Sequence, residues 1–254
     1  MRFRYQRQML TLIEEMGASI LYWLQAQYKK KPPATLAAMD STPSKAMLKK
    51  FRQLAKQWED RFNDAAPKIA EAYLKGSFKA TDSAMRRALK KAGLSVKFKM
   101  DAAMRDAFDA SLAENVGLIK SIPQRYLQQV EGVVARSYAS GRDLATMVAE
   151  LQKLYPKAQK RAVLIARDQS NKANSVVENA RRQEIGITQA VWLHSGGGKH
   201  PRKNHIAANG TTYEIRKGCP IKNEQTGVLE WIFPGQKINC RCVSRSIIPG
   251  LTAA

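Results

Sequence analysis

The sequence lacks long apolar runs and has few cysteines. No segment reaches the roughly 18 apolar residues that a membrane-spanning helix needs, and the first seven residues carry three arginines in place of the apolar core of a secretory signal. We therefore expect a protein that stays inside a cell or a particle and binds no membrane. Three cysteines, Cys219, Cys240 and Cys242, do not suit a disulfide framework, so reduced thiols are expected.

Acidic residues are also scarce: there are 21 against 43 lysines and arginines, which gives a formal net charge of +22. Residues 1–100 alone hold 21 basic and 8 acidic residues. This surplus favours a polyanionic partner, and binding of nucleic acid through its phosphates would be independent of base sequence and sensitive to salt. An acidic protein partner is the alternative.

Basic runs provide the candidate DNA contacts. Each run by itself is typical of a solvated helix face, and the pair Arg181-Arg182 is interpreted in the same way. Taken together, the basic runs indicate binding to phosphate. The candidates are Lys29, Lys30, Lys31, Lys49, Lys50, Arg86, Arg87, Lys90 and Lys91.

Apolar residues recur every three or four positions through most of the first 184 residues, which predicts amphipathic helices. Prolines are expected to separate them, because proline removes a backbone donor and clashes with the preceding turn. Residues 94–100 alternate apolar and polar positions, as in a short strand or an extended arm. The predicted helices are 4–29, 44–62, 67–76, 80–92, a segment from Asp101 to about Val116, one from Pro123 to Tyr138, 143–154 and 158–184.

The last part of the chain is rich in glycine, aromatic and β-branched residues, which predicts short strands at 189–194, 211–215, 228–233 and 241–247. Helices followed by an antiparallel sheet indicate the α+β class. We predict a basic helical arm at 1–100, a helical connector at 101–157, and a C-terminal domain at 158–254 that combines a long helix with a small sheet.

His205, Cys240 and Cys242 form a candidate metal-ligating set of one nitrogen and two sulfurs, for which zinc is the expected ion. In a strand the two cysteines would share one face, with Cα atoms about 6.5–7 Å apart. His200, His194 or Cys219 would be the fourth ligand. Plain packing of the thiols in a core and a cysteine nucleophile assisted by Arg241 are the alternatives. No cofactor is required by the sequence.

Two further interpretations concern phosphate chemistry. The run Gly196-Gly197-Gly198-Lys199-His200 lacks the spaced glycines and the Ser or Thr of a phosphate-binding loop, so a mobile loop is expected there. His200, Asn204 and His205 are compatible with a metal-dependent nuclease, although no acidic cluster accompanies them. This nuclease is the alternative function, and a host-encoded nucleoid or RNA-binding protein is another.

Taken in order, these motifs resemble the phage head-morphogenesis family, the Mu F-like minor head proteins of tailed phages. The resemblance covers roughly residues 110–245. Asp168 and Asn209 depart from the family pattern, so no role that needs a carboxylate is carried over to them. The residues that carry the resemblance are Glu114 to Pro123, Ile165, Ala166, Arg167, Asp168, Asn171, Asn174, Trp192, Arg202, His205, Gly210, Pro234, Gly235, Asn239, Cys240, Arg241 and Cys242.

The resemblance implies a non-enzymatic minor capsid protein that associates with the portal protein and with the major capsid or scaffolding protein. It implies a location inside the virion, after assembly in the host cytoplasm, with contacts to packaged phage DNA. The motif residues would then have structural roles. Gly210 and Gly235 would form turns closed to other residues, Pro234 would fix the entry to the last strand, Trp192 would fill a small core, and Arg202 and Asn239 would satisfy buried carbonyls.

Overall fold

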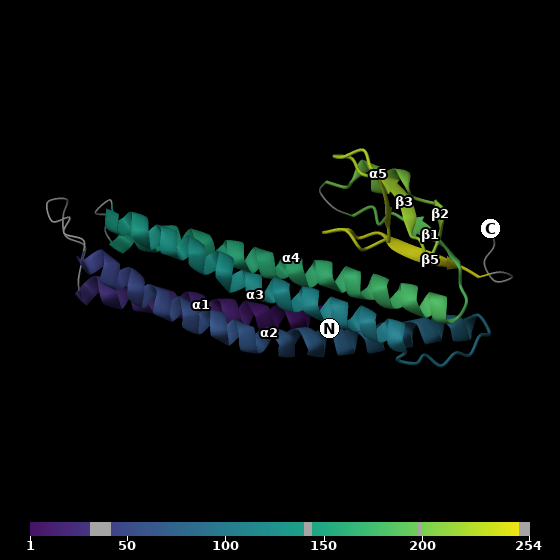
Figure 1. The fold of residues 1–254 in the computed structure, drawn as a ribbon, viewed down its shortest axis with the longest axis horizontal. Coiled ribbons are helices and arrows are strands. Elements are labelled where there is room, and N and C mark those ends of the chain that lie inside the picture. The colour runs from purple at the N-terminus through teal and green to yellow at the C-terminus, as the bar shows by residue number, and fades with distance from the viewer. Residues whose placement is uncertain (31–41, 140–143, 198–199, 249–254) are drawn as a thin grey trace. The chain divides into compact units, whose positions relative to one another are not determined.

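The computed structural model describes residues 1–30, 42–139, 144–197 and 200–248, without the side chains of 28–30, 42–46 and 138–139. The described helices and strands confirm the α+β class, with helices first and a small antiparallel sheet region after them (Figure 1). In chain order the elements are α1 (Arg2–Lys30), α2 (Thr42–Lys91), α3 (Ala102–Ala139), α4 (Leu144–Glu184), β1 (Gln189–Leu193), α5 (Lys203–Ala207), β2 (Thr212–Glu214), β3 (Cys219–Lys222), β4 (Leu229–Ile232) and β5 (Val243–Ile247).

The chain forms two compact units, each built from segments distant in sequence. The bundle unit comprises residues 2–71 and 113–166, and the sheet unit comprises residues 72–112 and 167–254 together with Met1. Helices α2, α3 and α4 therefore each contribute to both units. All strands and α5 belong to the sheet unit.

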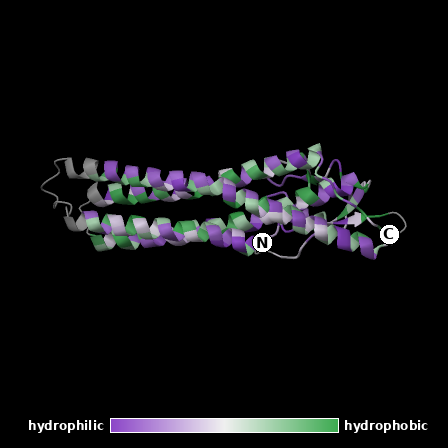
Figure 2. Cartoon of the chain, turned by 90° about the horizontal axis from the view of Figure 1, so that it is seen from below, coloured by the Kyte–Doolittle hydropathy of each residue, from purple (hydrophilic) through white to green (hydrophobic). Residues whose placement is uncertain are grey.

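The bundle unit is held by an apolar stripe along each helix. Met9, Ile13, Met16, Ile20 and Leu24 of α1 are fully buried at spacings of three and four residues, as an amphipathic helix requires. Figure 2 shows polar and apolar residues alternating along the helices. Among the described helices, none is both long enough and apolar enough to cross a bilayer.

Specific polar contacts join the helices of the bundle unit. The Tyr5 hydroxyl of α1 donates to Asn115 Oδ1 of α3 at 2.8 Å, and both residues are buried. The Trp58 indole of α2 donates to Ser19 Oγ of α1 at 3.2 Å. Arg161 of α4 donates to Ser121 Oγ of α3 at 2.7 Å. Each helix of this unit is therefore tied to a neighbour by a polar pair as well as by apolar packing.

Three prolines do not divide the helices, so the breaks predicted at these three positions were wrong. Pro67, Pro123 and Pro156 lie inside α2, α3 and α4. A proline inside a helix costs about 3 kcal/mol, but the buried apolar stripe of α2 continues from Phe62 to Tyr73 across Pro67. Burial of side chains on both sides of the proline outweighs the lost hydrogen bond.

Residues 94–100 form no described strand, so the extended-arm alternative is the correct one. The arm is bound to the end of α4. The Lys99 N–H donates to Glu184 Oε1 at 3.1 Å, and the Lys99 carbonyl accepts from Arg181. Local alternation of apolar residues was misleading because no described strand pairs with this segment.

The strands form two small sheets. One is a three-stranded antiparallel sheet in the order β2-β1-β5, and the other is the antiparallel pair β3-β4. Four strands lie where the sequence predicts them, whereas β3 and α5 were not predicted. Strand β3 contains Pro220, which argues against a strand in sequence but is tolerated at an edge.

A compact core joins the two sheets and α5. Trp192 of β1 is fully buried at its centre, as expected for the residue that fills a small core. The partly buried Ile185, Phe233 and Ile248 pack around it. The buried members are Ile187, Ala190, Trp192, Ala208, Tyr213, Ile215, Cys219, Ile221, Ile232, Cys240 and Cys242.

Arg181 and Arg182 of α4 are buried, so the interpretation of this pair as a solvated helix face was wrong. Arg181 forms a bidentate pair with Asp82 of α2, at 2.7 and 2.8 Å. Burial by itself would lower the pKa of Arg181, but hydrogen bonds to Asp82 and Glu184 raise it overall. The buried guanidinium therefore remains charged and ties α2 to α4.

Arg182 binds the sheet to the helix. Its guanidinium donates to Ser246 Oγ at 2.9 Å, to the Ser244 carbonyl at 3.0 Å and to the Ser244 hydroxyl, all on β5. It also pairs with Glu178 at 3.0 Å. Burial raises the pKa of Glu178, and Arg182 opposes that rise. One buried side chain thus fixes β5 against α4.

We expect Arg182→Ala to lower the free energy of unfolding by about 2–3 kcal/mol, because it leaves partly buried acceptors on β5 without their charged donor. Urea denaturation followed by tryptophan fluorescence measures this loss. Arg245→Ala is the matched control, since Arg245 lies exposed on the same strand, and should change the stability by less than about 0.5 kcal/mol. Equal effects of the two substitutions would contradict the role given to Arg182.

Candidate functional site

His205 is held on α5, a five-residue helix that sequence reasoning missed because it is too short to show a period. The His205 side chain is 3% exposed. Its ring meets the Trp192 ring edge to face, with centroids 5.1 Å apart and an interplanar angle of 83°. Asn204 ties α5 to β3, since its side-chain amide donates to the Lys222 carbonyl at 2.9 Å. The imidazole therefore has little freedom to move.

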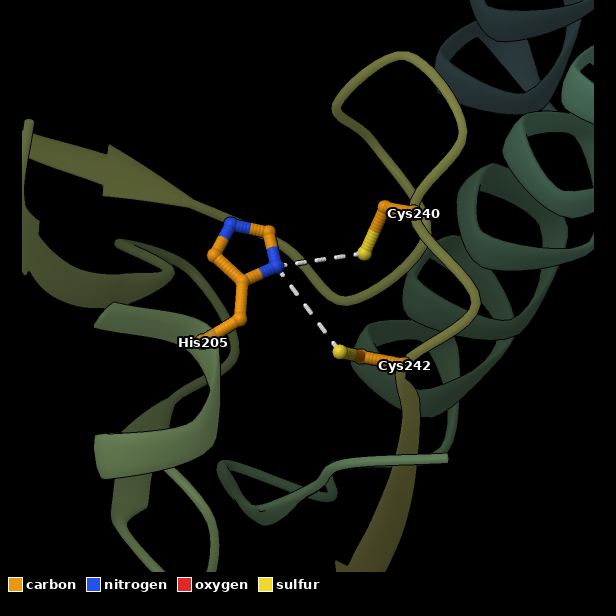
Figure 3. Close-up of side chains that lie close together, drawn as sticks. All are labelled: His205, Cys240 and Cys242. Atoms are coloured by element: carbon orange, nitrogen blue, oxygen red, sulfur yellow. Dashed lines mark hydrogen bonds between the residues drawn. The ribbon is translucent and has the colours of Figure 1, made fainter. Parts of the chain in front are cut away.

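Cys240 and Cys242 precede β5, in an extended segment outside the strand in which they were expected. Both are buried and Arg241 between them is exposed, so the predicted sharing of one face by the cysteines is correct. Figure 3 shows both sulfurs directed at the same imidazole nitrogen. The distances from His205 Nδ1 are 3.5 Å to Cys240 Sγ and 3.8 Å to Cys242 Sγ.

The cysteine loop, residues 234–242, is bound to α4 by three side chains of that helix. The Asn239 N–H donates to Asp168 Oδ1 at 2.7 Å. Asn171 Nδ2 donates to the Cys240 carbonyl at 2.7 Å, and Arg167 Nη2 donates to Asn239 Oδ1 at 2.8 Å. The helical and C-terminal parts of the sequence motif therefore bind one another, which their spacing of about 70 residues did not reveal.

Backbone geometry explains the glycines of the motif. Gly235 has φ 83°, and a Cβ there would lie 3.1 Å from the Asn171 carbonyl oxygen. Gly210 has φ 84° and open space around it. Both turns have the expected left-handed conformation that favours glycine. Gly235 is further restricted by its close approach to α4.

Arg202 and Asn239 were both expected to satisfy buried carbonyls, and their hydrogen bonds differ. Arg202 donates to a carbonyl, that of Ile238, at 3.0 Å. Asn239 satisfies no carbonyl in the described hydrogen bonds, so that expectation was wrong; it adopts φ 61° and accepts from Arg167 instead. Asparagine tolerates the left-handed region better than most residues because its short polar side chain bonds locally.

Hydrogen bonds determine how the two thiols share a proton. A hydrogen bond from Cys242 lowers the pKa of Cys240 against the effect of burial, and His205 and the Gly235 N–H lower it further. The same sulfur contact, with burial, raises the pKa of Cys242. The surroundings therefore favour the thiolate form at Cys240 over that at Cys242.

The cluster forms part of the wall of a basic pocket of about 590 Å³. Arg167, Arg202 and Arg241 line the pocket together with His194 and His200, and no carboxylate belongs to its described lining. Three guanidinium groups beside two imidazoles make it suited to an anion. The sequence suggested these histidines and Arg202 separately, and only the tertiary structure brings them together.

The three suggested fourth ligands lie outside the cluster. His205, Cys240 and Cys242 have ligand atoms within 4.8 Å of one another, and the described residues add no fourth member. His194 Nδ1 accepts from the Gly196 N–H at 3.2 Å, and His200 is exposed. Cys219 is buried in the sheet core, where burial raises its pKa.

The basic residues suggested as DNA contacts lie on α1 and α2 or beside them. Lys49, Lys50, Arg86, Arg87, Lys90 and Lys91 of α2 are exposed. Lys31 lies outside the described residues, as do the side chains of Lys29 and Lys30. Gly198 and Lys199 of the glycine-rich run lie outside them too.

We expect Gly210→Ala to destabilise the protein by about 1–2 kcal/mol, the cost of placing a Cβ in the left-handed region. Gly235→Ala should cost more, because the same strain is joined by the close contact with the Asn171 carbonyl. Urea denaturation of both variants measures the difference. Equal losses would show that the contact between the cysteine loop and α4 adds nothing to stability.

Comparison with known proteins identifies the region that contains this site. Residues 128–245 match the family described as phage Mu protein F like protein. A Haemophilus influenzae strain Rd protein described as uncharacterized is 34% identical over 143 residues. The matched segment covers 55% of this chain but only 29% of that protein. No solved structure matches the chain.

The matched residues include all of α4, the histidine on α5 and the entire cysteine loop, in the order that the sequence motifs predict. The resemblance stated from the sequence is therefore confirmed. Residues 128–245 of this chain are thus similar to the phage Mu protein F-like family.

Proposed function

We propose that this protein acts in head morphogenesis of a tailed phage, as a minor head protein that associates with the portal and lies inside the capsid. The observation that carries the proposal is the family match over residues 128–245. The portal protein and the major capsid or scaffolding protein are the proposed partners. The matched segment spans 29% of the relative's length, so no property of that whole protein enters the proposal.

The internal contacts of the motif residues support an architectural role over a catalytic one. Asp168 and Asn171 hold the backbone of the cysteine loop, and Gly235 permits the close approach of that loop to α4. The hydrogen bonds of these side chains stabilise the fold. A rigid sheet unit built on a long helix suits a protein that must keep its shape while a shell assembles around it.

Charge supports the DNA part of the proposal. The net charge of +22 would be offset inside a head filled with phosphate. The exposed residues Arg86, Arg87, Lys90 and Lys91 cluster within two turns of α2 and form no ion pair with a described residue. They are available to bind phosphate oxygens without reading bases.

The pocket gives less support to the metal-dependent nuclease. A hard cation such as Mg²⁺ is bound by carboxylate oxygens, and the described lining of the pocket contains none. Asp168 lies nearby, but it is occupied by the Asn239 N–H and by Lys172 at 3.4 Å. The non-enzymatic interpretation is therefore the one we propose.

We expect the protein to be present in purified heads and in DNA-free procapsids of the phage that encodes it. Sedimentation of both particles, followed by immunoblotting and by cross-linking to the portal, measures this directly. Heads from a phage with the gene deleted are the control for antibody specificity. Absence of the protein from every assembly intermediate would refute the proposal, whatever its affinity for DNA.

We also expect DNA affinity to fall steeply with salt. Replacing Arg86, Arg87, Lys90 and Lys91 by glutamine should lower the slope of log affinity against log salt by roughly 3–4, about one for each lost phosphate contact. Fluorescence anisotropy with a labelled duplex measures this slope.

The control variant removes the same charge from the sheet region, through glutamine at four exposed positions: Lys203, Arg216, Lys222 and Arg245. It should lower the slope by less than about one. An equal fall in both variants would show that net charge alone, and not the surface on α2, governs binding.

A further inference from the structure

We propose that His205, Cys240 and Cys242 bind one Zn²⁺ through three protein ligands, and that the fourth coordination position opens into the basic pocket and takes an exchangeable ligand. This inference goes beyond the morphogenesis function and does not depend on it. It rests on the geometry of the cluster, on the N–H groups around its sulfurs and on its place in the pocket wall.

The distances within the cluster fit a tetrahedral zinc ion. Zn–N bonds of about 2.0–2.1 Å and Zn–S bonds of about 2.3 Å place nitrogen and sulfur ligands roughly 3.6 Å apart. His205 Nδ1 lies 3.5 Å from Cys240 Sγ and 3.8 Å from Cys242 Sγ. All ligand atoms lie within 4.8 Å of one another. The three side chains can thus bind one ion without rearrangement of the loop.

The surroundings of the sulfurs suit thiolates better than thiols packed in an apolar core. The Gly235 N–H donates to Cys240 Sγ at 3.4 Å. The Trp192 indole N–H has no hydrogen-bond partner among the described residues, and the Trp192 ring packs against the His205 imidazole. N–H groups directed at metal-binding sulfurs are typical of the outer shell that orients ligands. Plain packing does not explain why a backbone N–H is directed at the Cys240 sulfur.

The position of the cluster explains why one coordination site stays open. All three ligands line the pocket, and within the described part of the chain no fourth ligand joins them. A zinc ion with three protein ligands retains a position for water or another small ligand. Because Arg167, Arg202 and Arg241 line the same pocket, the exchangeable ligand is an oxygen of water or of an anion.

Zinc would also stabilise this part of the fold. The ion would join α5 to the cysteine loop through ligands that lie 35 and 37 residues apart in sequence. Small domains with limited cores commonly rely on such a metal. The expected result of chelation is therefore a lower unfolding temperature of the sheet unit.

The first experiment measures zinc in the full-length chain, purified without a polyhistidine tag from cells grown with added zinc. Inductively coupled plasma mass spectrometry should find one Zn²⁺ per chain. His205→Ala, Cys240→Ser and Cys242→Ser should each lower the zinc content at least about tenfold. Cys219→Ser is the matched control, because Cys219 is buried outside the cluster, and should keep the wild-type content.

If the ligand variants fail to fold, the zinc content of the wild-type protein still tests the proposal. A zinc-free wild type, or one in which mass spectrometry finds a Cys240–Cys242 disulfide, would overturn the proposal. Equal zinc loss in Cys219→Ser and the ligand variants would overturn it too, because the loss would then follow from unfolding. A lower unfolding temperature of the wild type after chelation would support it.

The open position is tested by replacing zinc with Co²⁺ in the wild type. The visible spectrum of the cobalt protein should show thiolate-to-metal charge transfer and should shift when azide is added, because azide displaces the exchangeable ligand. His194→Ala and His200→Ala should leave the spectrum without azide unchanged. A spectrum insensitive to azide, or one altered by either substitution, would show a fourth protein ligand and refute the open site.

Discussion

The sheet unit depends on one face of α4, from which Asp168, Asn171 and Arg182 bind segments that follow much later in the chain. Asn171 follows Asp168 by three residues and Arg182 follows Asn171 by eleven, which is about three helical turns, so the three side chains project from the same side of the helix. Asp168 accepts the Asn239 N–H, Asn171 donates to the Cys240 carbonyl, and Arg182 binds β5. Each bond pairs a buried or partly buried backbone group that would otherwise lose its hydrogen bond on leaving water.

The chemistry of the candidate site follows from this attachment. Because α4 fixes the backbone at Asn239 and Cys240, the alternating direction of side chains brings both sulfurs to His205 and leaves Arg241 facing the pocket. The Trp192 ring on β1 packs edge to face against the His205 imidazole. The same helix contributes Arg167 to the pocket. Helix α4 therefore both holds the cysteine loop and contributes to the pocket wall. The proposed zinc ion is compatible with an architectural role of the sheet unit.

Much of this protein could be predicted from local sequence. The helical stripe of Met9, Ile13 and Met16, the strand that contains Trp192, and the common face of Cys240 and Cys242 all follow from periodicity. The predictions failed where long-range packing outweighs local preference. Pro67 lies within α2 because apolar burial continues on both sides of it, and Arg181 and Arg182 are buried because Asp82 and β5 supply partners about 100 and 60 residues away. The residues of α5 are too few to form a recognisable period, so the support of His205 was missed.

The sequence by itself determined the α+β class, the cationic surplus, the motif that resembles the phage Mu F-like family, and the candidate metal-ligating residues. These properties depend on composition, on order along the chain and on periods of two or three to four residues, all of which are local. Only the tertiary structure decided that the cysteines and His205 meet, that three arginines and two histidines line a pocket beside them, and that α4 holds the cysteine loop. The physical reason is that these contacts join residues 35 to about 70 positions apart, and chain closure over such lengths is fixed by the packing of the entire unit and not by any local preference.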